Sequence, residues 1–169
     1  MRPIIAFLFA LLLVSMQAAL LRYVGGGAVS LALALPIVVY LGLNGGNVDG
    51  AVGAAAVGYV VDLMAGGPKG LMTFLAVALF LGSRLAGGAL SVQGKAGFAV
   101  LSGVGTLLYG TAALLLTRAV SPDESAPAFS LLGRMLVEAL LTGLFAPLVL
   151  LALRRVEGLY AREEQGLLR

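Results

Sequence analysis

Three charged residues lie inside long apolar stretches of this chain and are the first candidates for a functional site: Asp62, Arg134 and Glu138. A charged side chain in the hydrocarbon core of a bilayer is costly, so it usually faces protein or water and marks an ion pair, a proton relay or a ligand site. Arg134 and Glu138 are spaced i,i+4 and can meet on one helix face. Because Asp62 lies on another apolar segment, we expect it to be the cross-helix partner of Arg134.

Two uncharged polar residues are predicted to lie at the same depth as these charges: Gln17, near the end of one apolar segment, and Thr73, near the start of another. The five side chains would form a polar network or pocket in the outer half of the membrane, whereas the inner half would be almost purely apolar. Two interpretations are open. Either the charges neutralise one another and lock the helices together, which is the favoured interpretation, or they bind a ligand.

The composition places these charges in a membrane protein. Hydrophobic residues make up 60% of the 169-residue chain and charged residues only 11%, with a mean hydropathy of +1.05, whereas soluble domains carry about 25% charged residues. The apolar residues form several separate runs without the alternation expected of barrel strands. The sequence therefore predicts an all-α membrane protein with about six transmembrane helices in one bundle.

The residue types argue against catalysis. The chain has no Cys and no His, which excludes disulfides, thiol nucleophiles, Cys/His metal sites and a His-based triad. No nucleophile–base pair or paired-acid arrangement is visible in the sequence. We therefore expect no enzymatic activity, no metal and no cofactor. The net charge of +3 comes from basic residues that cluster at predicted membrane boundaries, so nucleic acid is not an expected partner.

The transmembrane domain is predicted to cover residues 1–155, followed by a charged cytoplasmic tail at residues 156–169. Its spans are predicted at residues 3–21, 28–43, 50–65, 71–83, 96–117 and 131–153. The fourth segment, which ends at Arg84, would be only about 20 Å long, so the third and fourth segments are either a short hairpin or a pair extended by glycine-rich ends. A cleaved signal peptide is the alternative for the first span, although Arg22 favours a retained helix.

The distribution of basic residues predicts that both termini are cytoplasmic, because basic residues concentrate in cytoplasmic loops. In that orientation seven basic residues lie on the inner side, namely Arg2, Arg84, Lys95, Arg154, Arg155, Arg162 and Arg169, and three on the outer side, namely Arg22, Lys69 and Arg118.

One face of the third predicted span consists of small residues that lead to the acid. Gly50, Ala54, Gly58 and Asp62 recur at i,i+4 spacing, and small residues let two membrane helices approach closely. We therefore expect Asp62 to point into a helix–helix interface. The segment GGPKG that follows at residues 66–70, with Gly67, Pro68 and Gly70, is predicted to be a turn between two membrane helices, because it lacks the spacing of a phosphate-binding loop.

A family resemblance lies in the stretch from Tyr40 to Arg84. A span ends in YLGL (residues 40–43), a glycine-rich loop follows, and a small-residue helix ends in GYVVDL (residues 58–63). A GPKGL turn (residues 67–71) and an apolar segment that closes on Arg84 complete the pattern. In these motifs, and in its size and hydropathy profile, the chain resembles the bacterial rod-shape-determining protein MreD family.

The resemblance implies a non-enzymatic inner-membrane scaffold of the elongasome, the machinery for peptidoglycan synthesis that determines cell shape. The main partner would be MreC, bound by packing against its transmembrane helix. Indirect partners would be the actin-like MreB, RodA and a class B penicillin-binding protein, with membrane lipids around the bundle. The resemblance also implies a fold similar to the six-helix substrate-binding subunits of energy-coupling-factor transporters.

The alternative hypothesis is a substrate-binding membrane subunit of a small-molecule, vitamin-type transporter. It would use the Asp62, Arg134 and Glu138 pocket and borrow an ATPase module. Ala6 and Ala10 mildly favour it, because such subunits use an Ala-xxx-Ala face on their first helix. The lack of Trp argues against it, because these subunits often stack flat vitamins on aromatic rings.

Overall fold

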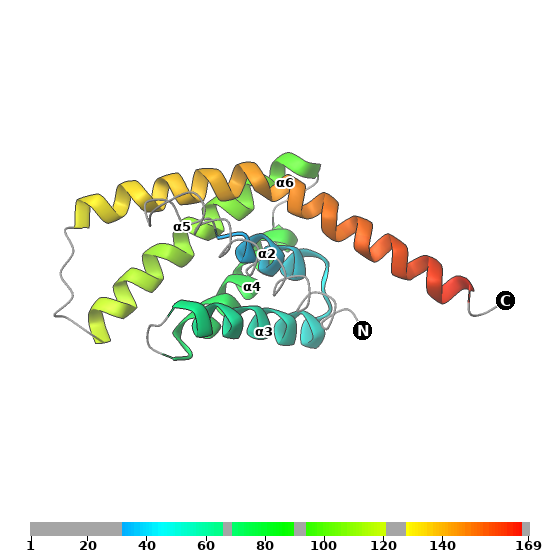
Figure 1. Cartoon of the computed structure of the whole chain (residues 1–169), viewed down its shortest axis with the longest axis horizontal. Coiled ribbons are helices and arrows are strands. Elements are labelled where there is room, and N and C mark those ends of the chain that lie inside the picture. The colour runs from blue at the N-terminus through cyan, green and yellow to red at the C-terminus, as the bar shows by residue number, and fades with distance from the viewer. Residues whose placement is uncertain (1–31, 66–68, 90–93, 121–127, 167–169) are drawn as a thin grey trace.

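The computed structural model describes residues 32–65, 69–89, 94–120 and 128–166. Over these ranges the chain forms helices and no strand (Figure 1): α2 (Ala34–Asn44), α3 (Asn47–Ala65), α4 (Leu71–Ala89), α5 (Gly94–Val120) and α6 (Ala128–Gly166). The predicted all-α fold is confirmed. The first predicted span, with Gln17, and the turn residues Gly67 and Pro68 lie outside the described residues.

Helix α2 is the central helix of the described bundle. Residues 34–42 are all buried, and α2 contacts α3, α4, α5 and α6; Figure 1 shows it in the middle of the molecule. Its sequence, ALPIVVYLGLN, is apolar around almost the whole circumference, which is typical of a helix packed on all sides. Pro36 lies in the first turn, where its missing N–H costs no intrahelical hydrogen bond.

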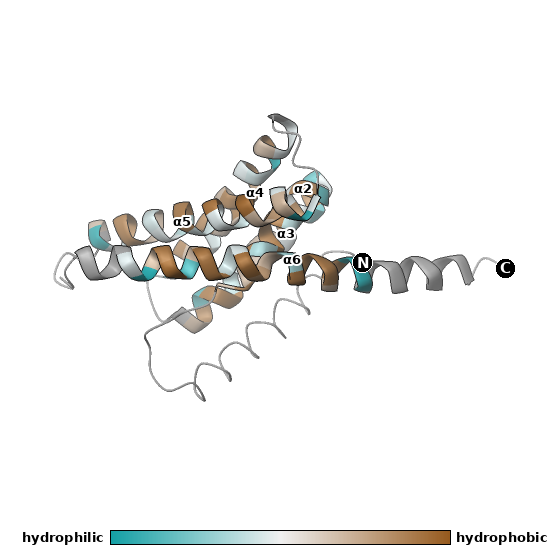
Figure 2. Ribbon diagram, turned by 90° about the horizontal axis from the view of Figure 1, so that it is seen from above, coloured by the Kyte–Doolittle hydropathy of each residue, from teal (hydrophilic) through white to brown (hydrophobic). Residues whose placement is uncertain are grey.

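Three described helices are long and apolar enough to cross a membrane: Leu71–Gly88 in α4, Gly94–Ala119 in α5 and Gly133–Arg155 in α6. In Figure 2 these helices are brown along much of their length. Large apolar side chains on their outer faces are highly exposed, with Leu85 at 75% and Leu140 at 73%. Such a surface fits a lipid environment better than water. These helices support a membrane-embedded protein, while the full set of six spans stays a prediction.

The prediction that the fourth segment ends at Arg84 is wrong, whereas the alternative of a segment extended by a glycine-rich end agrees with the structure. Helix α4 continues to Ala89 and has 19 residues, about 28 Å at the usual rise per residue. The helix can continue past Arg84 because this side chain has an acceptor within the protein. Its guanidinium donates a hydrogen bond to the backbone oxygen of Gly45.

Helix α6 also extends beyond its predicted span at residues 131–153. It runs for 39 residues to Gly166, so most of the predicted tail at residues 156–169 continues the helix. Its Arg, Glu, Leu and Ala residues are strong helix formers, which explains the continuation. Helix α6 bends in Figure 1. Pro147 lies inside this helix, and a proline inside a helix removes a backbone hydrogen bond and favours a bend.

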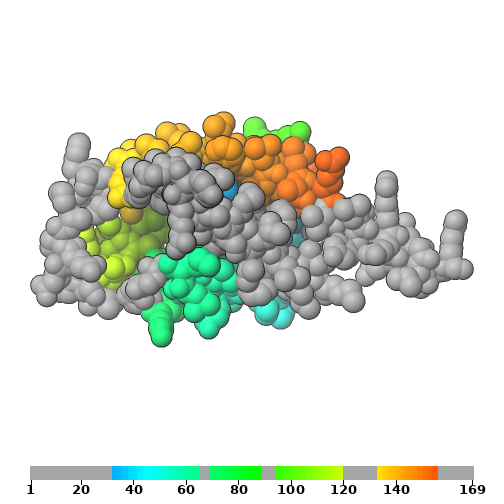
Figure 3. Space-filling view, in the orientation of Figure 1, coloured from blue at the N-terminus to red at the C-terminus, as the bar shows by residue number. Residues whose placement is uncertain are grey.

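Small residues bring the helices together at two interfaces. The predicted packing face of α3, Gly50, Ala54 and Gly58, lies inside the bundle: a Cβ atom on Gly58 would lie 2.6 Å from the Thr73 Cα atom of α4, and Ala54 is fully buried. Figure 3 shows α6 along one edge of the molecule beside α5, with α3 on the opposite side.

Helices α5 and α6 cross at a second pair of glycines. A Cβ atom on Gly143 would lie 3.2 Å from the carbonyl oxygen of Ala99 and 3.6 Å from the Cα atom of Gly103. Ala99 and Gly103 are spaced i,i+4, as are Ala139 and Gly143. Each helix therefore presents a small-xxx-small pair to the other, which is how membrane helices approach closely.

The α3–α4 contact predicts that one glycine-to-alanine change lowers stability and that a second, matched change does not. Gly58→Ala should destabilise the protein by about 1–3 kcal/mol, because the added methyl group meets α4 backbone that must move. Gly82→Ala is the matched control, because Gly82 is exposed and a Cβ atom there meets nothing within 4 Å. Thermal unfolding in mild detergent should show a lower midpoint for Gly58→Ala alone, and equal midpoints would contradict the close contact.

Candidate functional site

The Asp62 carboxylate, near the carboxyl end of α3, caps the amino-terminal end of α4. Its Oδ2 atom accepts hydrogen bonds from the backbone N–H groups of Gly70 (3.1 Å) and Thr73 (3.0 Å). Oδ2 also accepts one from the Thr73 hydroxyl at 2.5 Å, and Oδ1 accepts one from the Met72 N–H at 2.9 Å. Asp62 and Thr73, which the sequence analysis assigned to one polar network, are therefore in direct contact.

The start of α4 explains why the cap comes from another helix. The first backbone N–H groups of a helix have no acceptor within it, and the side chain of the N-cap residue often supplies one. Here the residue before the helix is Gly70, which has no side chain. Its φ angle of +91° lies in the left-handed region that favours glycine. Asp62 supplies the missing acceptor, and its negative charge suits the positive end of the helix dipole.

These hydrogen bonds limit what Asp62 can do chemically. Both carboxylate oxygens are engaged by groups of α4 and the residue before it. A ligand that binds Asp62, or a proton that it accepts, would have to compete with these backbone donors, which have no acceptor within α4. For Asp62 itself, the contacts favour the interpretation in which it locks the helices together.

Tyr109 of α5 connects this cap to the rest of the bundle. Its hydroxyl donates to the Met72 carbonyl oxygen at 3.5 Å and lies 3.2 Å from the Met72 sulfur. It is also close enough to Asp62 and Glu138 to interact electrostatically with both. Sequence analysis missed Tyr109. The available signal was a single phenol in the apolar segment 96–117, because a tyrosine hydroxyl in such a place normally has a partner.

The α6 residues of the predicted network lie one turn apart. Arg134 is exposed and Glu138 is half-buried. Both acids influence Tyr109 electrostatically, which indicates that Glu138 and Asp62 lie towards the same end of the bundle. Because the hydrogen bonds of Asp62 described above go to the start of α4, its pairing with Arg134 stays a prediction. Gln17 lies outside the described residues.

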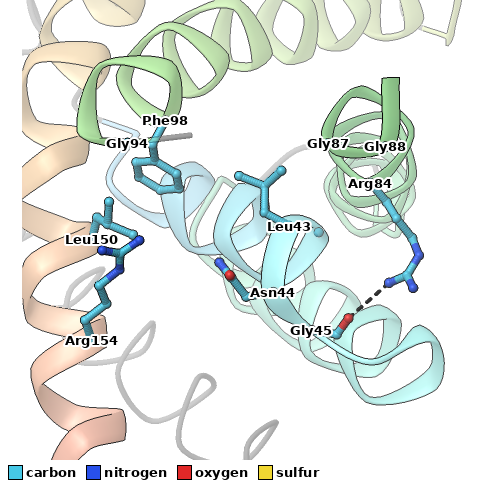
Figure 4. Close-up of a pocket in the computed structure, with 11 residues that line it drawn as sticks. Leu43, Asn44, Gly45, Arg84, Gly87, Gly88, Gly94, Phe98, Leu150 and Arg154 are labelled. Carbon is cyan, nitrogen blue, oxygen red and sulfur yellow. Dashed lines mark hydrogen bonds between the residues drawn. The ribbon is translucent and has the colours of Figure 1, made fainter. Parts of the chain in front are cut away.

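A second polar region surrounds a cavity of about 510 Å³ at the other end of α4. Figure 4 shows it between the carboxyl ends of α2 and α4, the start of α5 and the middle of α6. The sequence analysis did not predict a cavity here. Its lining residues are Gly42, Leu43, Asn44, Gly45, Arg84, Gly87, Gly88, Gly94, Phe98, Leu150 and Arg154.

Arg84 has a structural contact at the edge of this cavity. Its Nη1 atom donates a 3.0 Å hydrogen bond to the carbonyl oxygen of Gly45, drawn as a dashed line in Figure 4. Gly45 follows the last residue of α2, where backbone carbonyl groups lack intrahelical donors. Arg84 therefore ties α4 to the turn between α2 and α3.

No family model, curated protein or solved structure matches this sequence. A function must therefore be inferred from the residues, their contacts and the resemblance carried by residues 40–84.

The cap predicts a specific loss of stability for Asp62→Ala. Removing the carboxylate leaves the amides of Met72 and Thr73 without this acceptor, so the free energy of unfolding should fall by about 2 kcal/mol, the upper end for helix caps. Asp49→Ala is the control, because Asp49 is an exposed acid in the first turn of the same helix.

Thermal unfolding in detergent and amide hydrogen exchange would measure these effects. Exchange at residues 70–73 should accelerate in Asp62→Ala and stay unchanged in Asp49→Ala. Unaltered exchange at those amides in Asp62→Ala would show that the carboxylate is not their acceptor in solution.

Proposed function

We propose that this protein is a non-enzymatic scaffold subunit of the bacterial cell-wall elongation machinery, embedded in the inner membrane, that binds MreC through helix packing. In this role it would hold MreC in place and so couple the cytoplasmic MreB filament to RodA and a class B penicillin-binding protein. The observation that carries the proposal is the Asp62 cap. The residue best suited to chemistry is engaged in holding two helices together.

The residues that carry the resemblance to MreD make the contacts that shape the α2–α4 unit. Gly42 packs so closely on α4 that a Cβ atom would lie 2.8 Å from the Phe80 carbonyl oxygen. Gly58 packs against Thr73, Asp62 caps α4, and Arg84 binds the turn after α2. The glycines, the acid and the base that carry the resemblance therefore form one structural unit.

Because the small face of α3 is used inside the chain, a partner helix needs another surface. The outer face of α4 offers one. Ala78 and Gly82 are exposed and spaced i,i+4, and a Cβ atom on Gly82 meets nothing within 4 Å. Phe74, 66% exposed, and Leu85 lie on the same side of the helix and could flank a partner. This surface combines small residues for close approach with large ones for contact area.

The transporter hypothesis would require a ligand site in the outer half of the bundle. The Asp62 oxygens there are occupied by backbone and hydroxyl donors, whereas the described cavity lies at the other end of α4. This arrangement favours the scaffold.

A pull-down from native membranes tests the proposal. The tagged protein, solubilised in mild detergent, should recover MreC in near-equal amount. Gly82→Leu should lower that recovery about tenfold, because the side chain separates the helices without disturbing the fold. Gly133→Leu is the matched control, because Gly133 on α6 is equally exposed and open.

Recovery of a transporter membrane subunit with paired ATPases would contradict the scaffold function and favour the alternative. Equal MreC recovery with both variants would exclude the outer face of α4 as the contact surface. In cells, depletion of the protein should round a rod-shaped bacterium, whereas a transporter subunit would produce a nutrient requirement.

A further inference from the structure

The cavity at the carboxyl end of α4 has the chemistry of an anion site. Arg84 from α4 and Arg154 from α6 line it from two sides. Asn44 adds an amide, whose nitrogen also donates a 3.4 Å hydrogen bond to the Tyr40 carbonyl oxygen. No acidic side chain is among the described residues that line it. Arg84 uses one nitrogen for the Gly45 carbonyl, and a guanidinium has five N–H donors, so it keeps donors for a ligand.

The backbone adds to this positive character. Gly94, the first residue of α5, lines the cavity, and a helix amino terminus carries free N–H groups and a positive partial charge. Gly87, Gly88 and Gly94 contribute no side chains to the lining, which leaves room for a ligand of headgroup size. The rim reaches the molecular surface, because Asn44, Gly88 and Arg154 are exposed.

The surroundings favour a lipid over a soluble anion. Leu85 follows Arg84 in α4 and is 75% exposed, and Leu151 lies three residues before Arg154 in α6 and is 46% exposed. Apolar surface that could take acyl chains therefore lies beside both arginines. Arg84, Lys95, Arg154 and Arg155 gather at this end, the side on which basic residues predict the cytoplasm. Basic pockets between transmembrane helices on that side suit anionic headgroups.

We propose that this cavity, which Arg84 and Arg154 line from opposite sides, binds the phosphate of an anionic phospholipid. Arginine suits this role because its planar guanidinium can bind two phosphate oxygens at once. The acyl chains would lie over the exposed leucines of α4 and α6. This site does not require the scaffold function, because it involves neither Asp62 nor the small residues Ala78 and Gly82, and Leu85 borders both surfaces.

Arg154 and Arg155 provide a matched pair of variants. Both are exposed and adjacent on α6, and each glutamine substitution removes one positive charge, but only Arg154 lines the cavity. Arg84→Gln would be less informative, because it also breaks the hydrogen bond to Gly45.

Native mass spectrometry of the full chain in detergent would measure the binding. With added cardiolipin or phosphatidylglycerol we expect a bound lipid that phosphatidylcholine does not replace. Arg154→Gln should weaken binding about tenfold, and Arg155→Gln should change it by no more than about twofold. Thermal unfolding without lipid should be the same for both variants.

Three outcomes would overturn the proposal. Equal lipid binding by the two variants would show that only overall charge matters. Equal binding of phosphatidylcholine would show that the site does not select an anionic headgroup. A stabilisation by millimolar glycerol phosphate or inorganic phosphate as large as that by the lipid would identify a site for a soluble phosphate instead.

Discussion

The free backbone N–H groups at the start of α4 are the constraint on which this part of the fold depends. They have no acceptor within the helix, and Gly70, with its positive φ angle, has no side chain that could supply one. Asp62 meets this need from the neighbouring helix. The carboxyl end of α3 must therefore lie beside the amino end of α4. Small residues such as Gly58 then let the two backbones approach closely enough for the carboxylate to reach.

A complementary interaction holds the other end of α4. Arg84 donates to the Gly45 carbonyl, so an acid binds amides at one end of the helix and a base binds a carbonyl at the other. Each charge matches the partial charge of the backbone groups that it meets. Between these two points the buried α2 packs against every other described helix. The α2–α4 unit thus combines a closely packed apolar interior with two charged side chains that bind backbone groups. Asp62 and Arg84 each have a structural role in these contacts.

Helix type and approximate position could be predicted from the sequence because the apolar runs are long and continuous, and the turn at residues 44–47 follows from its asparagines and glycines. The end of α4 could not be predicted, because Arg84 resembles a residue that leaves the membrane until its acceptor on another helix is known. Asp62 was expected in a helix interface together with Thr73, but three of its four donors are backbone amides, which no pattern of side chains reveals. Tyr109 and the cavity depend on which helices become neighbours, and apolar periodicity does not determine that.

The described residues divide between the interior and the surface of the bundle in a consistent way. At the α3–α4 and α5–α6 contacts, the neighbouring helix fills the space beside the glycines, whereas Gly82 faces open space. Gly82 and Arg84 are only two residues apart on α4, so the proposed partner surface ends close to the rim of the arginine-lined cavity. A partner helix on Ala78 and Gly82 and a lipid in this cavity would therefore lie close together near one end of α4. Arg84 also binds the turn after α2, so the contact that joins α4 to this turn lies at the edge of the same cavity.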